Sequence, residues 1–340
     1  MKKFIVFLIV LTIMPTMMMA DGYSKLWKQV EQAAEDELPQ DEIKLLQEIV
    51  KKAKKQHSYG NLLKAELLLN EVMLEISPDS AAVAFRAIET ETAAMEGQDP
   101  VMAAVYNCVL GKMYREGYSA VNPEASYSEG YDKAKECYRK AMSNPALLAR
   151  HKAGELKPAL VEGYHSYIYN HDLLSVIGYE TKDFETLHNW YESQGMRAAS
   201  MMTALQLLKS KSHYERNFEK SQYRQQLDSL IEKYGDLKEC GEVACERYEH
   251  MTDCRDTSTG QVVDYIHEVL DRWGDWPTCQ GLRNDLERLT NPSFSAEVET
   301  NVQRPGPEGG VVAVSQHVTV AHAVFNRHFG DGAVEGRVNR

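Results

Sequence analysis

Apolar residues recur at helical spacing through most of this chain, from Ser24 to about Leu289, and strand-like alternation is hardly seen there. The stretch between Leu62 and Ile76 is one example, with leucines and a valine three or four positions apart. An apolar stripe of this kind becomes stable when it packs against another element. The spacing therefore predicts an all-α fold.

Helix-breaking residues divide this region at intervals of roughly twenty residues, which is typical of antiparallel helix pairs joined by short turns. The breaks lie at Pro39, Tyr59-Gly60, Ser77-Pro78-Asp79, Gly97-Gln98-Asp99-Pro100 and Asn144-Pro145. Further helices are predicted at residues 184–191, 196–208, 218–234, 240–250, 262–273 and 282–289.

One part of the chain matches the core positions of a tetratricopeptide repeat. The matching residues are Leu110, Gly111 and Tyr114 in the first helix, and Ala134, Tyr138 and Ala141, followed by Pro145, in the second. Small residues let the two helices approach while aromatic rings fill the groove between them. The residues 117–130 form an insertion that an unmodified repeat lacks. We therefore predict a tetratricopeptide-like array of antiparallel helix hairpins over residues 21–290.

The N-terminus has the order of features of a signal peptide. Lys2 and Lys3 precede an apolar run over residues 4–14, and Ala20 is a small residue at the exit. The run is shorter than the roughly 20 residues of a membrane-spanning helix, so an uncleaved anchor is the weaker alternative. The pattern predicts a signal peptide at residues 1–20, cleavage between Ala20 and Asp21, and a secreted or periplasmic protein that leaves the membrane after signal removal.

The formal net charge of −12 disfavours binding to nucleic acid or anionic lipid. The one basic run, at residues 51–55, has the spacing of a solvated helix face.

Residues 291–340 differ in character from the helical region. Phe294, Ala296, Val298 and Val302 alternate with polar residues, a Pro/Gly linker covers residues 304–310, and residues 311–324 are rich in β-branched side chains. An isolated hairpin is marginally stable in water, so we expect a short β-prone tail that is either an incomplete β-type segment or disordered.

The chain contains six cysteines, an even number that permits disulfides in an exported protein. The bridges considered are Cys108 to Cys137 and Cys254 to Cys279, with buried free thiols as the alternative. Cys240, Cys245, His250 and Cys254 suggest a zinc site, but on a continuous helix only His250 and Cys254 share a face. Neither a metal nor another cofactor is therefore predicted.

No catalytic motif stands out in the sequence. Metalloprotease, nucleophile-elbow and phosphate-loop patterns are missing, so no catalytic residue is predicted. His165 and His171 lie among tyrosines, where we expect a helix packing face. Five further tyrosines can form a protein-binding surface or pack as core: Tyr106, Tyr114, Tyr118, Tyr127 and Tyr131.

Several short motifs resemble the helical N-terminal region of large secreted bacterial alpha-2-macroglobulin-like proteins. They include residues 23–31, Leu38-Pro39, residues 62–65, Arg272-Trp273-Gly274-Asp275-Trp276-Pro277 and residues 289–294. The resemblance implies protease trapping by a longer chain of β domains with a Cys-x-Glu-Gln thioester. Cys245-Glu246-Arg247 does not fit that motif, so no functional residue carries over, and a truncated or frameshifted member is expected.

The sequence thus predicts a secreted helical scaffold that binds a protein partner, the remainder of a larger chain, or proteases. A free-standing tetratricopeptide-like binding protein is the main alternative. A helical periplasmic enzyme is a weaker one, because its paired carboxylates cannot be recognised among 50 acidic residues.

Overall fold

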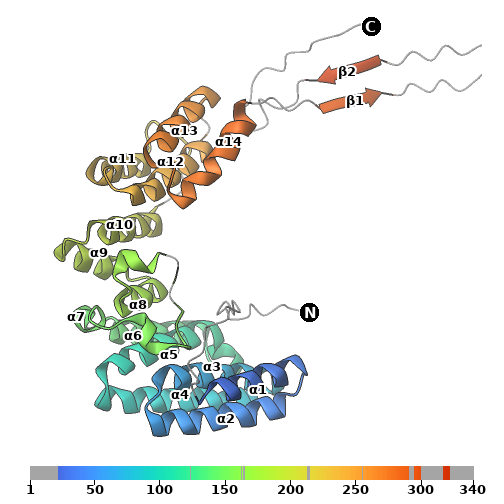
Figure 1. Cartoon of the computed structure of the whole chain (residues 1–340), viewed down its shortest axis with the longest axis vertical. Coiled ribbons are helices and arrows are strands. Elements are labelled where there is room, and N and C mark those ends of the chain that lie inside the picture. Colours follow the sequence, from blue (N-terminus) through green and yellow to red (C-terminus); the bar gives the residue numbers. More distant parts are fainter. Residues whose placement is uncertain are drawn as a thin grey trace, which may run out of the picture. The chain divides into compact units, whose positions relative to one another are not determined.

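The computed structural model describes residues 22–290, except for 123, 162, 164, 213, 214 and 255, and two short strands nearer the C-terminus. The helices pack in sequential antiparallel pairs, which confirms the all-α prediction (Figure 1). The sequence predicts one helical region over residues 21–290, whereas the contacts divide the chain into two compact units, Met1–Lys182 and Asp183–Arg340.

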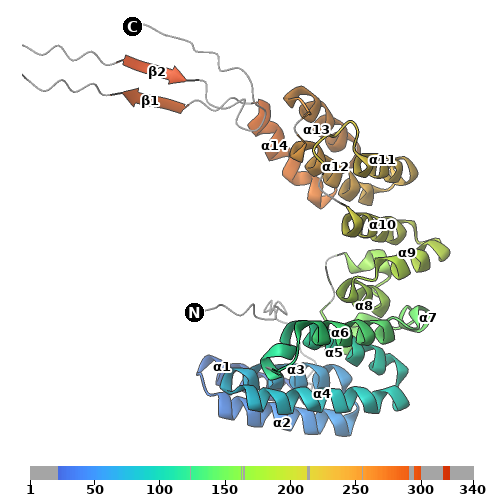
Figure 2. The ribbon, with the colours of Figure 1, turned by 180° about the vertical axis from the view of Figure 1, so that it is seen from behind.

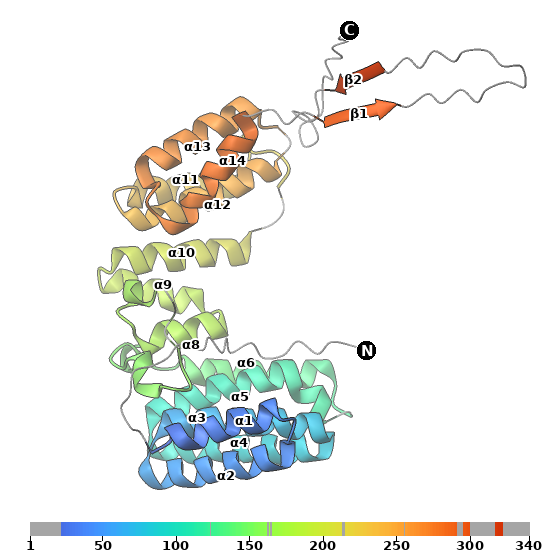
Figure 3. The ribbon, with the colours of Figure 1, turned by 45° about the vertical axis from the view of Figure 1, so that its right-hand side comes forward.

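The described residues of the first unit form eight α-helices, and the long ones lie side by side in chain order (Figure 3). They are α1 (Ser24–Glu35), α2 (Pro39–Gln56), α3 (Tyr59–Ile76), α4 (Pro78–Gln98), α5 (Pro100–Val121), α6 (Tyr127–Ala141), α7 (Pro145–Leu148) and α8 (Leu173–Thr181). Two 3₁₀ turns, η1 (Ala153–Leu156) and η2 (Ser166–Tyr169), precede α8.

The predicted breaks fall at helix N-termini. Proline occupies the first position of α2, α4, α5 and α7, where its missing N–H costs no hydrogen bond. Ser77 caps α4 by accepting from the Ser80 N–H, and Asp99 caps α5 by accepting from two backbone N–H groups. Each of these turns therefore both ends one helix and starts the next.

Helices α5 and α6 approach each other closely because glycines lie at their interface. A Cβ atom on Gly111 would lie 2.6 Å from the Tyr138 ring, and one on Gly130 would lie 2.8 Å from the Tyr114 carbonyl oxygen. The predicted insertion at residues 117–130 mostly lengthens these two helices, since α5 continues to Val121 and α6 begins at Tyr127.

The core of the first unit is mostly apolar and includes a polar network around Glu66. Leu46, Ile49 and Ala53 of α2 are fully buried against α3. The Tyr106 hydroxyl of α5, also fully buried, donates to Glu66 of α3 at 2.8 Å. Lys54 of α2 pairs with Glu66 and with Glu91 of α4, so the network links four successive helices.

The second unit repeats the hairpin arrangement (Figure 2). Its elements are α9 (Phe184–Ser193), α10 (Arg197–Lys211), α11 (Gln222–Tyr234), η3 (Lys238–Cys240), α12 (Gly241–Asp253), α13 (Thr259–Trp273), η4 (Pro277–Gln280) and α14 (Gly281–Thr290). The six helices predicted from residue 184 onward are confirmed, with ends that differ by a few residues. Strands β1 (Ser295–Glu299) and β2 (His317–Ala321) pair antiparallel, with Val298 opposite Val318.

The prediction that His165 and His171 lie on a helix packing face is wrong. The described residues there form the short turn η2, followed by Asn170 and His171 in the left-handed conformation. The Asp172 side chain then caps α8 by accepting from the Ser175 N–H at 2.8 Å. Two consecutive residues at positive φ cannot continue a right-handed helix, so the segment turns instead.

Candidate functional site

Exposed apolar side chains gather at one end of the first unit. Helices α2 and α3 have 18 residues each and are joined by a short turn, so the start of α2 lies beside the end of α3. Only Ser77 separates α3 from α4. This end carries four exposed large apolar side chains, and Val83 is the most exposed of them, at 63%. They are Leu38, Leu74, Ile76 and Val83.

Acidic residues surround these side chains. Burial, reinforced by repulsion from Glu75 and Glu71, raises the pKa of the Glu42 carboxyl above its ordinary value. Burial and the charge of Glu75 likewise raise the pKa of Glu71. Further acidic side chains are exposed at the same end: Glu35, Asp36, Glu37, Asp41 and Asp79. We call this surface, with Leu38, Leu74, Ile76 and Val83, the acidic-apolar end.

The four tyrosines whose side chains the structure describes, of the five considered as a binding surface or as core, do not share one exposed surface. Tyr106 is fully buried in the polar network of the core, whereas Tyr131 is exposed on α6. Tyr114 and Tyr118 are half-buried and belong to an aromatic cluster. The side chain of Tyr127 lies outside the described residues.

The aromatic cluster joins α4, α5 and α6. The Phe85 and Tyr114 ring centroids are 5.3 Å apart, and those of Tyr114 and Tyr118 are 5.2 Å apart, both in edge-on contact. Lys133 Nζ lies 4.4 Å from the Tyr118 ring centroid and also bonds the Tyr118 hydroxyl. The rings and the lysine thus satisfy one another, which makes this cluster a packing feature of the hairpin.

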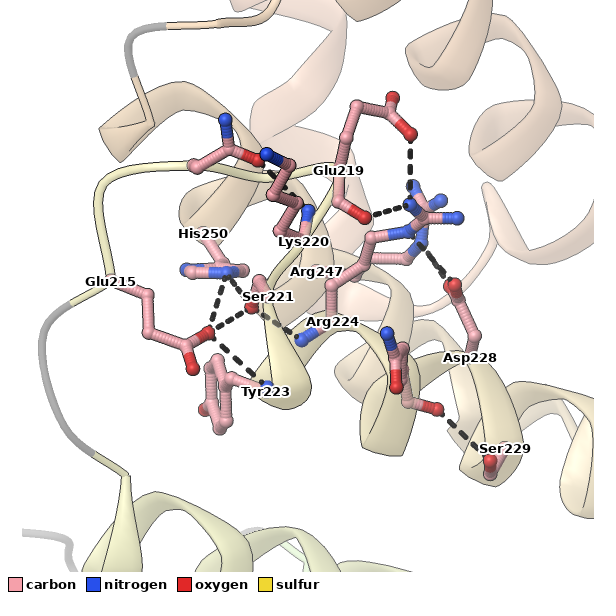
Figure 4. A network of polar contacts seen from close by, with 12 residues as sticks. Glu215, Glu219, Lys220, Ser221, Tyr223, Arg224, Asp228, Ser229, Arg247 and His250 are labelled. Atoms are coloured by element: carbon pink, nitrogen blue, oxygen red, sulfur yellow. Dashed lines mark hydrogen bonds and ion pairs between the residues drawn. The ribbon is translucent and has the colours of Figure 1, made fainter.

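A serine, a histidine and a glutamate meet in the second unit in an arrangement that resembles a hydrolase triad. Figure 4 shows Ser221 at the start of α11 between His250 of α12 and Glu215 of the preceding loop. The Ser221 Oγ lies 2.7 Å from His250 Nε2, and its hydroxyl donates to Glu215. Burial lowers the pKa of His250, against the opposing charge of Glu215.

The geometry of these three groups is that of a helix cap. Ser221 Oγ accepts from the Arg224 N–H at 2.9 Å, and only 2% of Ser221 is exposed. Glu215 Oε2 lies 4.0 Å from His250 Nε2, the ring nitrogen that already faces the serine. In a triad the acid bonds the other ring nitrogen and the hydroxyl faces a substrate site. Ser221, His250 and Glu215 are therefore not arranged as a catalytic triad.

A pocket of about 410 Å³ opens beside this network between α11, α12 and α13. Its lining mixes the Arg247 and Arg272 guanidinium groups with four carboxylates and the Tyr265 and Trp273 rings. Arg247 lies 4.3 Å from the Tyr265 ring centroid and pairs with Asp228, and Arg272 pairs with Glu268. The four carboxylates outnumber the two guanidinium groups, so the lining carries a net negative charge, and both guanidinium groups already have carboxylate partners.

All six cysteines are buried free thiols in the structure. Cys108 of α5 and Cys137 of α6 are on the two predicted halves of one hairpin. Cys279 does not face Cys254 but Cys245, at 3.4 Å between the two sulfur atoms. Cys254 instead contacts the Glu215 carbonyl oxygen. The bridges Cys108–Cys137 and Cys254–Cys279 thus stay predictions.

The structure separates the cysteines and histidine of the suggested zinc site. His250 and Cys254 do share a face, with 3.9 Å between Nε2 and Sγ, but Cys245 turns toward Cys279. Among the described residues, no three His, Cys, Asp or Glu side chains are grouped so that they could hold a metal ion.

The predicted signal peptide with Ala20 and Asp21, and most of residues 291–340, lie outside the described residues. In the described part of the chain, no helix combines the length and the apolar character of a membrane span. Comparisons with protein-family models, curated proteins and solved structures found no match to this chain.

Proposed function

We propose that this protein is a helical scaffold that binds another protein, with the acidic-apolar end of the first unit as its contact surface. The observation that carries the proposal is that four of the seven large apolar side chains exposed among the described residues belong to the α1–α2 turn, the end of α3 and the start of α4, which lie at this end. Contiguous exposed apolar side chains rimmed by polar groups commonly mark interaction sites.

The charge of this surface selects the partner. Burial raises the pKa of Glu42 and Glu71, and repulsion among Glu42, Glu71 and Glu75 raises it further. A cationic group placed among them relieves this repulsion, whereas an anionic one adds to it. The partner therefore presents a basic and apolar segment, such as an amphipathic helix with lysines beside leucines.

Two further proposals made from the sequence fit this scaffold. The hairpin of α5 and α6 is tetratricopeptide-like, which the contact between Gly111 and the Tyr138 ring supports. The protein is secreted or periplasmic, a proposal that rests on the signal-peptide pattern of residues 1–20.

The test is binding of a synthetic amphipathic helix of leucine and lysine, measured by calorimetry at low and high salt. Val83→Ser removes apolar contact area, and we expect it to weaken binding about fivefold, from roughly 1 kcal/mol of lost burial. Glu75→Lys reverses a charge and is expected to weaken binding more at low salt than at high salt.

The matched control is Val161→Ser, because Val161 is also exposed in the first unit, at 68%, but lies away from the acidic-apolar end in sequence. It is expected to leave the affinity unchanged. Equal affinity of all three variants and the unsubstituted chain would contradict the proposal, as would stronger binding of a glutamate-leucine helix.

Protease trapping, the function that the alpha-2-macroglobulin-like resemblance implies, predicts a different result. A trap forms a stoichiometric complex with an active endopeptidase after cleavage of a bait, and the bait-like stretch is the linker at residues 304–310. Size-exclusion chromatography after incubation with an endopeptidase separates the two: co-elution with the protease supports trapping, and peptide binding without it supports the scaffold.

A further inference from the structure

Three of the six thiols lie together in the core of the second unit. Cys240 ends η3, Cys245 is on α12, and Cys279 is in η4. Cys240 and Cys279 are fully buried and Cys245 is nearly so. The Cys245 and Cys279 sulfur atoms are 3.4 Å apart, with the Cys245 thiol donating to Cys279.

We propose that Cys245 and Cys279 form a disulfide when the chain folds under oxidising conditions. The bond needs the two sulfur atoms to approach by roughly a further 1.4 Å, to about 2.05 Å. Side-chain rotation and small shifts of η4 can supply such a displacement, since η4 is one short turn between α13 and α14.

Glycine at position 241 makes the approach of η4 to α12 possible. A Cβ atom on Gly241 would lie 2.8 Å from Cys279 Sγ and 2.8 Å from Trp276 Cβ. Real Cβ atoms do not come so near to other heavy atoms, so any other residue at 241 would push η4 away. The missing side chain at position 241 therefore allows Cys279 to lie beside α12.

Cys254, the fourth cysteine of this unit, has other neighbours. Cys254 Sγ contacts the Glu215 carbonyl oxygen at 3.4 Å and faces His250. Cys279 also points its thiol at the Gly241 carbonyl oxygen, at 3.5 Å, which holds its sulfur near the start of α12. Cys245 is thus the cysteine that Cys279 contacts.

The contact also makes the two thiols unequal in the folded unit. Because the Cys245 thiol donates a hydrogen bond to Cys279, the pKa of Cys279 lies below that of an ordinary thiol. The pKa of Cys245 lies above it for the same reason and because of burial.

The oxidant is a small-molecule or protein disulfide. The thiolate of one cysteine of the pair attacks one sulfur of that disulfide, which releases a thiolate and leaves a mixed disulfide. The other cysteine then loses its proton and attacks the protein sulfur of the mixed disulfide, which releases the second thiol. Two thiols lose two electrons, and the oxidant takes up two electrons and two protons to become two thiols. Because both cysteines are buried in the folded unit, the exchange takes place during folding.

Peptide mapping of the full chain tests the proposal. The protein is unfolded and reduced, refolded with a mixture of reduced and oxidised glutathione, and alkylated. It is then cut with trypsin and a glutamate-specific protease, because cleavage after Glu242 separates Cys240 from Cys245. We expect a linked pair of peptides that contains Cys245 and Cys279, and alkylated Cys240 and Cys254.

Linkage of Cys279 to Cys254 or to Cys240, or six alkylated thiols, would overturn the proposal.

The second readout is the thermal midpoint of the second unit with and without a reductant. We expect reduction to lower it by at least about 5 °C in the unsubstituted chain and in Cys254→Ser. In Cys245→Ser the reductant should leave the midpoint unchanged, and an equal shift there would contradict the pairing. This inference is independent of the proposed partner binding, since the acidic-apolar end belongs to the other unit.

Discussion

Gly111 is a residue whose missing side chain sets the packing of a whole hairpin. An added Cβ would meet the Tyr138 ring at 2.6 Å and the Ala134 carbonyl oxygen at 3.2 Å. We expect Gly111→Ala to lower the free energy of unfolding by about 1–3 kcal/mol through overpacking, partly offset by the better helix propensity of alanine.

The same helix offers a matched control. Gly117 is also in α5, but a Cβ atom there would meet nothing within 4 Å. Gly117→Ala is expected to raise the free energy of unfolding by up to about 1 kcal/mol. Urea unfolding followed by circular dichroism measures both variants, and a destabilised Gly117→Ala beside an unchanged Gly111→Ala would contradict the packing argument.

His250 gives the second unit a pH dependence with a definite sign. Burial lowers the pKa of its imidazole in the folded state, against the charges of Glu215, Asp253 and Glu246 and together with that of Arg247. Below about pH 6.5 the unfolded chain therefore binds a proton that the folded unit excludes, so stability falls as the pH falls through this value.

The test compares thermal midpoints of the full chain between pH 7.5 and pH 5.5. In His250→Gln the amide can still bond Ser221, and we expect its midpoint to fall less over this range than that of the unsubstituted chain. His267→Gln is the control, because His267 is exposed on α13 in the same unit. An identical pH dependence in all three proteins would show that His250 does not titrate as argued.

At the scale of elements, the buried network around Glu66 fixes four helices against one another. Burial raises the pKa of Glu66, while the Tyr106 hydroxyl and Lys54 counteract this shift. Tyr106→Phe leaves one buried carboxylate oxygen without its donor, and we expect it to cost about 1–3 kcal/mol of stability. Tyr131→Phe, an identical change at an exposed position of α6, should cost almost nothing. Chemical unfolding of both variants decides, and equal stabilities would exclude the network as a source of stability.

The helices were predictable because residues at their ends, such as prolines and capping side chains, mark where several of them start. Proline at the first position of α4 and α5, with Ser77 and Asp99 as caps, marks those helix starts in the sequence itself. The turn η2 was not predictable from periodicity, because the left-handed residues Asn170 and His171 interrupt an otherwise apolar stretch. Local pattern thus gives the element and its start, but not every irregular turn.

A repeated turn in the second unit carries the cysteine contact that the sequence reasoning missed. Tyr234-Gly235-Asp236 before Cys240 recurs as Trp273-Gly274-Asp275 before Cys279. In both places a helix ends, a 3₁₀ turn contains the cysteine, and the next helix starts with glycine. Comparing the two copies would have placed Cys279 in a short turn directly before a helix. Cys254 is nearer to Cys279 in the sequence than Cys245 is. The close contact at Gly241, which brings Cys279 to Cys245, forms only in the folded chain.

At the scale of the whole molecule, the boundary between the two units is invisible in composition. Lys182 ends α8 in the left-handed conformation, and the Asp183 side chain caps α9 by accepting from the Thr186 N–H. No proline-rich or glycine-rich linker marks the place, so the sequence favours one continuous array. The acidic-apolar end could not be recognised in the sequence either, because it combines the α1–α2 turn with the end of α3 and the start of α4.

The division into two units leads to a prediction about folding. Each unit has its own buried core, with Leu46 and Ile49 in the first and Val243 and Ile266 in the second, all fully buried. Residues 22–182 and 183–290, expressed separately, should therefore each be helical and unfold cooperatively on heating. Their far-ultraviolet circular dichroism spectra should add up to that of residues 22–290.

A fragment cut within the first unit, ending after Gln98 of α4, serves as the control. It exposes the face of α4 that packs on α5 and should therefore lose helicity. If residues 183–290 were unfolded alone but helical when mixed with residues 22–182, the second unit would depend on the first for folding, which would contradict the prediction.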